Sequence, residues 1–345
     1  MKGLVERLDT NFFLRKLNKV KESLGKRKGP NVIWLRENED DTKLTIPDPN
    51  GKTGINTMSR ALTDFEEGIA VLTGKPNSGK STILVNMMLQ SLSLNNDLVV
   101  IDFSFDDNAK KRYQQYVASQ SGLTYQEITT STDLTPNQLL AKKQAEQRLE
   151  ELIKTRRLYL FESSEQFEDG FWAIRKPERM MMIGKMVRDE HPGKKIAVFV
   201  DAWNDVDTSD AKGSNDLERS RNVLRDLQDW STDQKLMVFL SAHLRKTNDG
   251  KPGMDDIKGI GELSYNAVWI GLVRNELREN VLTEPLVYEE GEFLYPIATV
   301  ETVKTKSSCW DLPIFYVLKA MMCGLKPLTR QESIGIFSQY KEKRR

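Results

Sequence analysis

Cysteine is scarce in this chain, which has only Cys309 and Cys323. The two residues form no metal-binding spacing and no disulfide framework, so the sequence argues against a zinc module and against a small disulfide-stabilised domain. Long apolar runs are absent as well, and charged residues follow Met1 where a signal peptide would be apolar. We therefore expect a cytoplasmic protein with no membrane partner.

An excess of one charge is also lacking, because 51 lysines and arginines nearly balance 50 aspartates and glutamates. This balance argues against a general polyanion binder, so any nucleic-acid surface must be a local basic patch. The 345 residues show no internal repeat and suffice for a large core, arranged as one large domain or two smaller ones.

The stretch from Gly68 to Leu92 carries the clearest motif. An apolar start predicts a strand, a G-x-x-x-x-G-K-S segment follows from Gly74 to Ser81, and later apolar residues are spaced as on a buried helix face. A glycine turn before an ordinary helix is the alternative, but strand, loop and helix in this order favour a Walker A site for ATP and Mg²⁺. The predicted nucleotide-binding residues are Gly74, Lys75, Pro76, Asn77, Ser78, Gly79, Lys80, Ser81 and Thr82.

Within this loop the chemistry assigns two roles. Lys80 can reach the β- and γ-phosphates, and the Ser81 hydroxyl can ligate Mg²⁺. A second apolar run, residues 196–200, ends in Asp201 and is typical of a Walker B strand, whose carboxylate holds the water shell of the metal. We therefore predict that Ser81 and Asp201 form the metal site.

A third apolar run, residues 98–103, leads into Asp106 and Asp107. The carboxyl ends of strands are where α/β sheets place active residues. Hydrolysis of ATP needs a carboxylate that orients the attacking water, and Asp106 is our first choice, with Asp107 and Asp102 as alternatives. A cation must also stabilise the transferred phosphoryl group, and this basic residue can come from another subunit.

The order of elements predicts an α/β protein with a mostly parallel sheet and helices on both faces. One P-loop domain is expected over 50–325, preceded by an N-terminal arm (1–49) and followed by a short helix and basic tail (326–345). An amphipathic helix at 9–24 in the arm either folds back on its own domain or docks on a neighbouring subunit. Further helices are expected at 108–119, 137–156, 176–190 and 214–232, and further strands at 158–161, 236–240, 267–273, 297–304 and 314–318.

Motifs in this order resemble the RecA-like core of DnaB-type replicative DNA helicases and the helicase half of phage primase-helicases. Phe103-Ser104-Phe105-Asp106 resembles the family's Phe-Ser-Leu-Glu, and Ser241–Arg245 resembles its phosphate-sensing motif. Asp256–Leu263 resembles the segment after its DNA-binding loop, and Val303–Lys306 resembles its Lys-x-Arg pair. The lead-in at Thr53–Gly68 is similar too, so the resemblance spans roughly 50–310.

The resemblance implies roles for these residues. Asp106 would be the catalytic base and His243 a γ-phosphate sensor, although His243 could instead be a buried structural histidine. Lys304 and Lys306 would reach into the neighbouring subunit's ATP site. The predicted DNA contacts are Arg245, Lys246, Lys251 and Lys258, although the last three could simply belong to a solvated loop.

Function follows from the same resemblance, which implies a homo-oligomeric ring, most simply a hexamer, moving 5′→3′ on single-stranded DNA and parting the duplex. A primase or helicase loader is an implied partner, in a bacterium or for a phage in its host's cytoplasm. Two positions depart from the family: Asp106 replaces Glu, and Lys306 replaces the Arg with its planar fork. The family's N-terminal domain has no counterpart. The rival hypothesis is a RecA-like DNA-dependent ATPase that assembles on DNA or protein without unwinding.

Overall fold

The structure is a computed structural model of the chain. It describes residues 67–130, 133–162, 174–244, 267–275, 286–305, 314–326, 328 and 330–343. The predicted N-terminal arm with its helix at 9–24, the lead-in at 53–66 and the basic loop after Leu244 lie outside the described residues.

A single ten-stranded sheet organises the described part of the molecule, in the order β10-β9-β8-β6-β1-β5-β4-β2-β3 with β7 paired to β8. Six strands form its parallel half: β1 (Gly68–Gly74), β2 (Leu98–Ser104), β3 (Leu158–Glu162), β4 (Lys195–Asp201), β5 (Leu236–His243) and β6 (Trp269–Asn275). Four strands form the antiparallel half: β7 (Val287–Glu290), β8 (Phe293–Thr305), β9 (Ile314–Lys319) and β10 (Gly324–Lys326).

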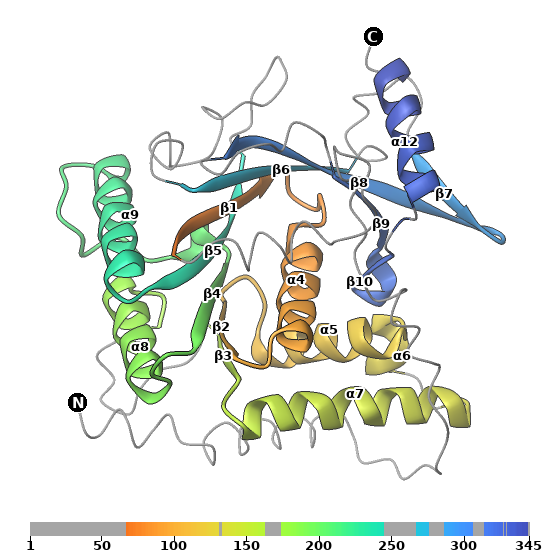
Figure 1. Cartoon of the computed structure of the whole chain (residues 1–345), viewed down its shortest axis with the longest axis horizontal. Helices are drawn as coiled ribbons and strands as arrows, with labels where there is room; N and C mark the ends of the chain where they lie inside the picture. The colour runs from red at the N-terminus through yellow and green to blue at the C-terminus, as the bar shows by residue number, and fades with distance from the viewer. Residues whose placement is uncertain are drawn as a thin grey trace.

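Helices cover both faces of the parallel half, as predicted (Figure 1). One face carries α4 (Lys80–Leu94), α5 (Ala109–Ser121), α6 (Tyr125–Thr129) and α7 (Pro136–Lys154); the other carries α8 (Pro177–Glu190) and α9 (Asp216–Asp233). Two short 3₁₀ turns, η2 (Trp203–Asp205) and η4 (Ala320–Met322), follow β4 and β9. The α/β class is thereby confirmed. No helix among the described residues is both long enough and apolar enough to cross a membrane.

Local sequence explains where these helices begin. Thr135 accepts a hydrogen bond from the Gln138 backbone N–H while the Gln138 side chain accepts one from the Thr135 backbone, a capping box that starts α7 with Pro136 in its first turn. Asn108 caps α5 by accepting from the Lys111 N–H, and Gly122 ends α5 in the left-handed conformation. The cap at Asn108 matters most, because it starts α5 directly after the Asp106–Asp107 turn.

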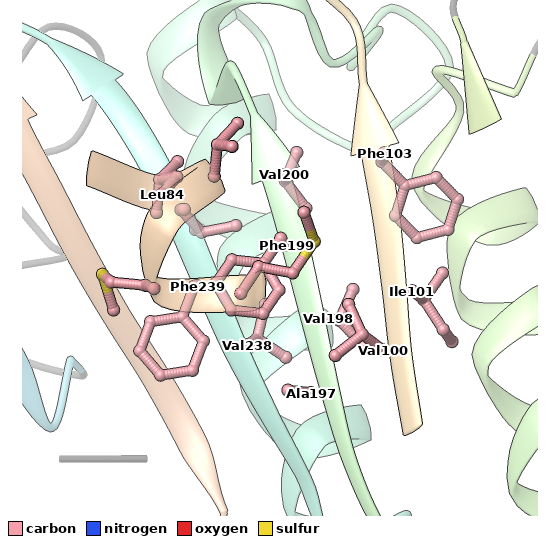
Figure 2. Close-up of a cluster of buried hydrophobic side chains, with 14 of the residues drawn as sticks. Leu84, Val100, Ile101, Phe103, Ala197, Val198, Phe199, Val200, Val238 and Phe239 are labelled. Atoms are coloured by element: carbon pink, nitrogen blue, oxygen red, sulfur yellow. The ribbon is translucent and has the colours of Figure 1, made fainter. Parts of the chain in front are cut away.

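Buried apolar side chains fix the parallel strands against the helices. Strands β1, β2 and β5 are apolar along nearly their whole length because helices pack on both faces. In Figure 2, Phe199 of β4 lies against Phe239 of β5, with stacked rings whose centroids are 4.9 Å apart, and Leu84 of α4 lies nearby. This packed core holds the carboxyl ends of the parallel strands in fixed relative positions.

The antiparallel half has an apolar cluster of its own, formed by Leu286, Ile297, Phe315, Val317, Leu328, Ile336 and Tyr340. The last two belong to α12 (Arg330–Lys343), which packs beside β7 and β8 (Figure 1). Strands at 297–304 and 314–318 were predicted, whereas β7, β10 and the antiparallel pairing were not. Short strands such as the three-residue β10 carry too few residues for a recognisable alternation.

Candidate active site

The phosphate loop connects β1 to α4 as the sequence predicts. Gly79 has φ 102° and precedes the helix, and no side chain caps the first turn of α4. A Cβ atom on Gly79 would lie 3.0 Å from Leu318 Cδ2, and one on Gly74 would lie 2.6 Å from the Val273 carbonyl oxygen. Glycine is therefore required at both positions, and the uncapped backbone N–H groups of the helix start suit an anion.

A cavity of about 500 Å³ opens over this loop. Pro76, Asn77, Gly79, Lys80, Ser81 and Thr82 line one side of it. Asp106, Asp201 and His243 line it as well, so the structure brings together predicted residues from four separate segments of the chain. The volume is that of a small-molecule site, and it is centred on the loop.

Lys80 lies inside this cavity with its side chain bent over the loop. Its Nζ donates to the carbonyl oxygens of Gly74 at 3.1 Å and Lys75 at 2.9 Å. The side chain is buried, so its charge acts at short range and with little screening. A second donor on the loop, Ser78 Oγ, is buried without a hydrogen-bond partner among the described residues. Both groups suit a phosphate.

Asp201 stands at the carboxyl end of β4 and is only 2% exposed. Its Oδ1 accepts a hydrogen bond from Ser241 Oγ at 2.5 Å, and its Oδ2 accepts one from Arg112 Nη1 at 3.1 Å. The Asp201 carbonyl oxygen also accepts the backbone N–H groups of Phe105 at 2.6 Å and Asp106 at 3.0 Å. These bonds join the predicted Walker B residue to the turn that carries the predicted base.

The three candidate bases have different surroundings. Asp102 is fully buried and paired with Arg112, and Asp107 accepts from Gln115 Nε2 at 2.7 Å and pairs with Lys111. Asp106 is exposed and lines the cavity. Partial burial and repulsion from Asp201 raise the pKa of Asp106 above its usual 3.8. Of the three carboxylates, Asp106 is therefore the one placed to face a water molecule in the cavity.

His243 ends β5 directly opposite Gly74 in the strand register. Its backbone N–H donates to Asn204 Oδ1 at 2.8 Å, while its half-buried ring lines the cavity with Nδ1 unbonded among the described residues. Burial, and then the charge of Lys80, lower the pKa of His243 below its usual 6.5. The ring is therefore neutral at pH 7, with a nitrogen facing polar surroundings.

Other predicted residues are not at this cavity. Lys304 lies in β8, eight residues beyond the cavity-lining Pro296, which is about 26 Å further along the strand at roughly 3.3 Å per residue. Lys306 and the predicted DNA contacts Arg245, Lys246, Lys251 and Lys258 lie outside the described residues.

Comparison with known proteins places this geometry. No family model and no curated protein matches the sequence. Among solved structures, the isolated ATPase domain of one DnaB-like replicative helicase superposes with a TM-score of 0.60 over 76% of this chain and 85% of its own, at 15% identity. A second DnaB-like replicative helicase, solved to study its interactions with primase, superposes with a TM-score of 0.61 over 76% of this chain, at 16% identity. The chain has the fold of a DnaB-type helicase ATPase domain.

The predicted resemblance is thus confirmed at the level of the fold. The chain spans 58% of the length of the second of these helicases, so the match concerns its ATPase core and leaves a large part of that protein without a counterpart in the alignment. Identities near one residue in six carry the fold but not the details of activity, direction or partners.

A magnesium ion fits the helicase-type site. No cluster of three or more His, Cys, Asp or Glu side chains in the described part of the chain has the geometry of a complete metal site. Mg²⁺ in phosphate-loop sites asks for less, because phosphates and water fill most of its octahedral shell. Ser81 and Asp201 line the same cavity and offer the two oxygens that such an ion takes from the protein.

Several site residues escaped sequence reasoning. Arg112 and Ser241 hold Asp201, and Asn204 holds the backbone of His243. An arginine in line with Tyr113, Tyr116 and Val117 on the buried face of a predicted helix is the one signal that could have revealed Arg112. The far wall of the cavity was also missed; it consists of Asn275, Pro296, Leu318 and Ala320.

Proposed function

We propose that this protein is an ATP-dependent DNA helicase that assembles as a homo-oligomeric ring and moves along single-stranded DNA. One observation carries the proposal: the phosphate loop, Asp106, Asp201 and His243 line a single cavity in a fold shared with helicase ATPase domains. A phosphate loop alone would support only nucleotide binding. The added carboxylate and histidine supply groups that hydrolysis and its coupling to movement require.

In this mechanism the loop N–H groups and Lys80 bind the β- and γ-phosphates of ATP. Ser81 and Asp201 hold Mg²⁺, which supplies neutralisation of the phosphate charge. Asp106 orients the attacking water, and its raised pKa makes it a better proton acceptor than an ordinary aspartate. His243, neutral at pH 7, lies between Lys80 and Asp106 in charge terms and reports the presence of the γ-phosphate.

Movement requires a link from the ATP site to DNA and to a second copy of the chain. His243 ends the strand that leads into the predicted DNA-binding residues Arg245, Lys246, Lys251 and Lys258. Lys304 and Lys306 follow a strand that runs away from the chain's own cavity, and we propose that they complete the site of a neighbour in a hexamer. Such a ring travels 5′→3′ and is loaded, or accompanied, by a loader or primase.

Hydrolysis tests the motor directly. ATP turnover by the wild-type chain should be stimulated by single-stranded DNA, and Lys80→Ala should abolish turnover because the phosphate-binding ammonium is lost. Lys185→Ala is the matched control, since Lys185 is an exposed lysine on α8 that pairs with Asp189. Turnover that survives Lys80→Ala, or that does not respond to single-stranded DNA, contradicts the proposal.

Mixing experiments test the contribution of the neighbour. The Asp106→Asn chain keeps both trans-acting lysines, and a Lys304→Ala/Lys306→Ala chain keeps an intact cavity. Each should be inactive alone, and mixing them should restore part of the turnover because some interfaces then combine an intact cavity with intact lysines. Mixtures without any activity, under conditions where the two chains co-assemble, exclude a site shared between copies.

A further inference from the structure

A buried ionic network lies directly beneath the cavity. Arg112 Nε and Nη2 donate to the two carboxylate oxygens of Asp102 at 2.8 and 3.1 Å, and Arg112 Nη1 donates to Asp201 Oδ2 at 3.1 Å. Tyr116 donates its hydroxyl to Asp102. Arg112 and Asp102 have no exposed surface and do not line the cavity, so the guanidinium bridges an inner carboxylate to the outer one.

The fold explains why these groups meet. Strands β2 and β4 pair in parallel, with Asp102 opposite Phe199 and Asp201 opposite Ser104. The two carboxylates are therefore offset by two positions and point to the same face of the sheet. Helix α5 packs over that face, and Arg112 and Tyr116 are one helical turn apart on it. Helix and strands thus present an arginine to a pair of aspartates.

The inner part of the network is saturated, whereas the outer part is not. Asp102 accepts both arms of the guanidinium fork, a rigid planar arrangement that fixes the position of the third arm. That arm takes one lone pair of Asp201 Oδ2, and Ser241 takes one of Oδ1. A carboxylate has about four acceptor sites, so Asp201 keeps two for a metal shell.

We propose that Arg112 is a positioning residue, which, anchored on Asp102, fixes the Asp201 carboxylate in the orientation that serves the metal. This inference rests on the proposed function only as far as the binding of Mg²⁺ and nucleotide. Burial by itself would lower the pKa of the Arg112 guanidinium, but Asp102, Tyr116 and Asp201 outweigh it and raise that pKa, so the bridge stays charged. The network also carries a net negative charge, two aspartates against one arginine, that favours a cation.

Charge-conserving substitutions separate orientation from charge. Arg112→Lys keeps the positive charge and loses the fork, so it cannot hold both carboxylates in the same geometry. Arg112→Gln removes the charge and makes the site more negative, which by charge alone would tighten Mg²⁺ binding. Tyr116→Phe is the matched control, because it removes a hydrogen bond from Asp102 without touching Asp201.

The readout is binding and needs no hydrolysis. A fluorescent ATP analogue is titrated into the full-length chain at a series of Mg²⁺ concentrations and in EDTA, with thermal melts to verify folding. We expect Arg112→Lys and Arg112→Gln to weaken apparent Mg²⁺ affinity about 10- to 100-fold, as loss of a residue that orients a metal ligand commonly does. Binding in EDTA should be nearly unchanged, and Tyr116→Phe should keep the wild-type Mg²⁺ dependence while melting earlier.

Several outcomes overturn the inference. Arg112→Lys with wild-type Mg²⁺ dependence does so, as does tighter Mg²⁺ binding by Arg112→Gln. If neither variant folds, Asp102→Glu takes their place, since it keeps every charge and moves the anchor by one methylene; unchanged Mg²⁺ dependence in that variant contradicts the role. A wild-type chain that binds no nucleotide at all contradicts instead the proposed function.

Discussion

The two halves of the sheet differ in what they bring to the cavity. The parallel half supplies polar and charged groups from the ends of its strands: Lys80 after β1, Asp106 after β2, Asp201 on β4 and His243 on β5. The antiparallel half supplies a mainly apolar wall, in which Pro296, Leu318 and Ala320 take part. We infer that the parallel half acts on the phosphates and that the antiparallel half faces the remainder of the nucleotide.

The contact between the halves is close. Gly79 of the phosphate loop lies against Leu318 of β9, and Asn86 of α4 donates to the carbonyl oxygen of Cys323 at 2.9 Å. The loop that binds phosphate therefore rests on the apolar wall. Changes on the parallel side should affect the chemical step, whereas changes on the wall should affect binding.

The largest effect is expected on the parallel side. Asp106→Asn keeps the shape of the side chain and removes its ability to accept a proton, so kcat for ATP should fall about 100- to 10,000-fold with little change in KM. Steady-state turnover at several ATP concentrations measures both values. Asp106→Glu, which restores the family's residue, should remain active. A kcat within tenfold of wild type for Asp106→Asn would move the base to another residue.

A smaller effect on binding is expected at the wall. Ala320→Asp places a negative charge in the cavity, near the position expected for a polyanionic nucleotide, so KM for ATP should rise about tenfold, or roughly 1.4 kcal/mol, with kcat nearly kept. Met321→Asp is the control, because Met321 is 66% exposed and does not line the cavity. Equal effects of the two substitutions would mean that the wall does not contact the nucleotide.

Stability should respond to Asp106 in the opposite sense to activity. The pKa of Asp106 is raised in the folded protein, so its contribution to stability is present below pH 3.8 and is lost as pH rises through the folded pKa. Asp106→Asn removes that loss. The variant should melt slightly later than wild type at pH 7, and the difference should shrink as pH approaches 4. Earlier melting at pH 7 would show that the carboxylate stabilises the free protein.

The smallest effect is expected for His243. Its pKa is lowered in the folded protein, so its contribution to stability is present above pH 6.5 and is lost as pH falls through the folded pKa. Urea unfolding at pH 7.5 and pH 5.5 should show a smaller loss of stability on acidification for His243→Gln than for wild type. A variant that loses as much as wild type would exclude this histidine as a source of acid sensitivity.

Local patterns were enough to predict the parallel half. Each of its strands is a short apolar run, and Lys80 and Asp201 follow such runs at the places where α/β sheets put ligands. The antiparallel half depends on pairing between distant residues, as in the bond from Asn86 to Cys323, and no local window contains that information. Arg112 was hidden for the same reason, because its partners Asp102 and Asp201 come from two different strands.

Unwinding of a forked DNA duplex tests the central claim most directly. With ATP and Mg²⁺, the wild-type chain should displace the labelled strand, and it should not do so with a non-hydrolysable ATP analogue or when Lys80 is replaced by alanine. Single-stranded DNA that stimulates ATP hydrolysis without any displacement of the strand would contradict the helicase and favour a RecA-like ATPase that assembles on DNA.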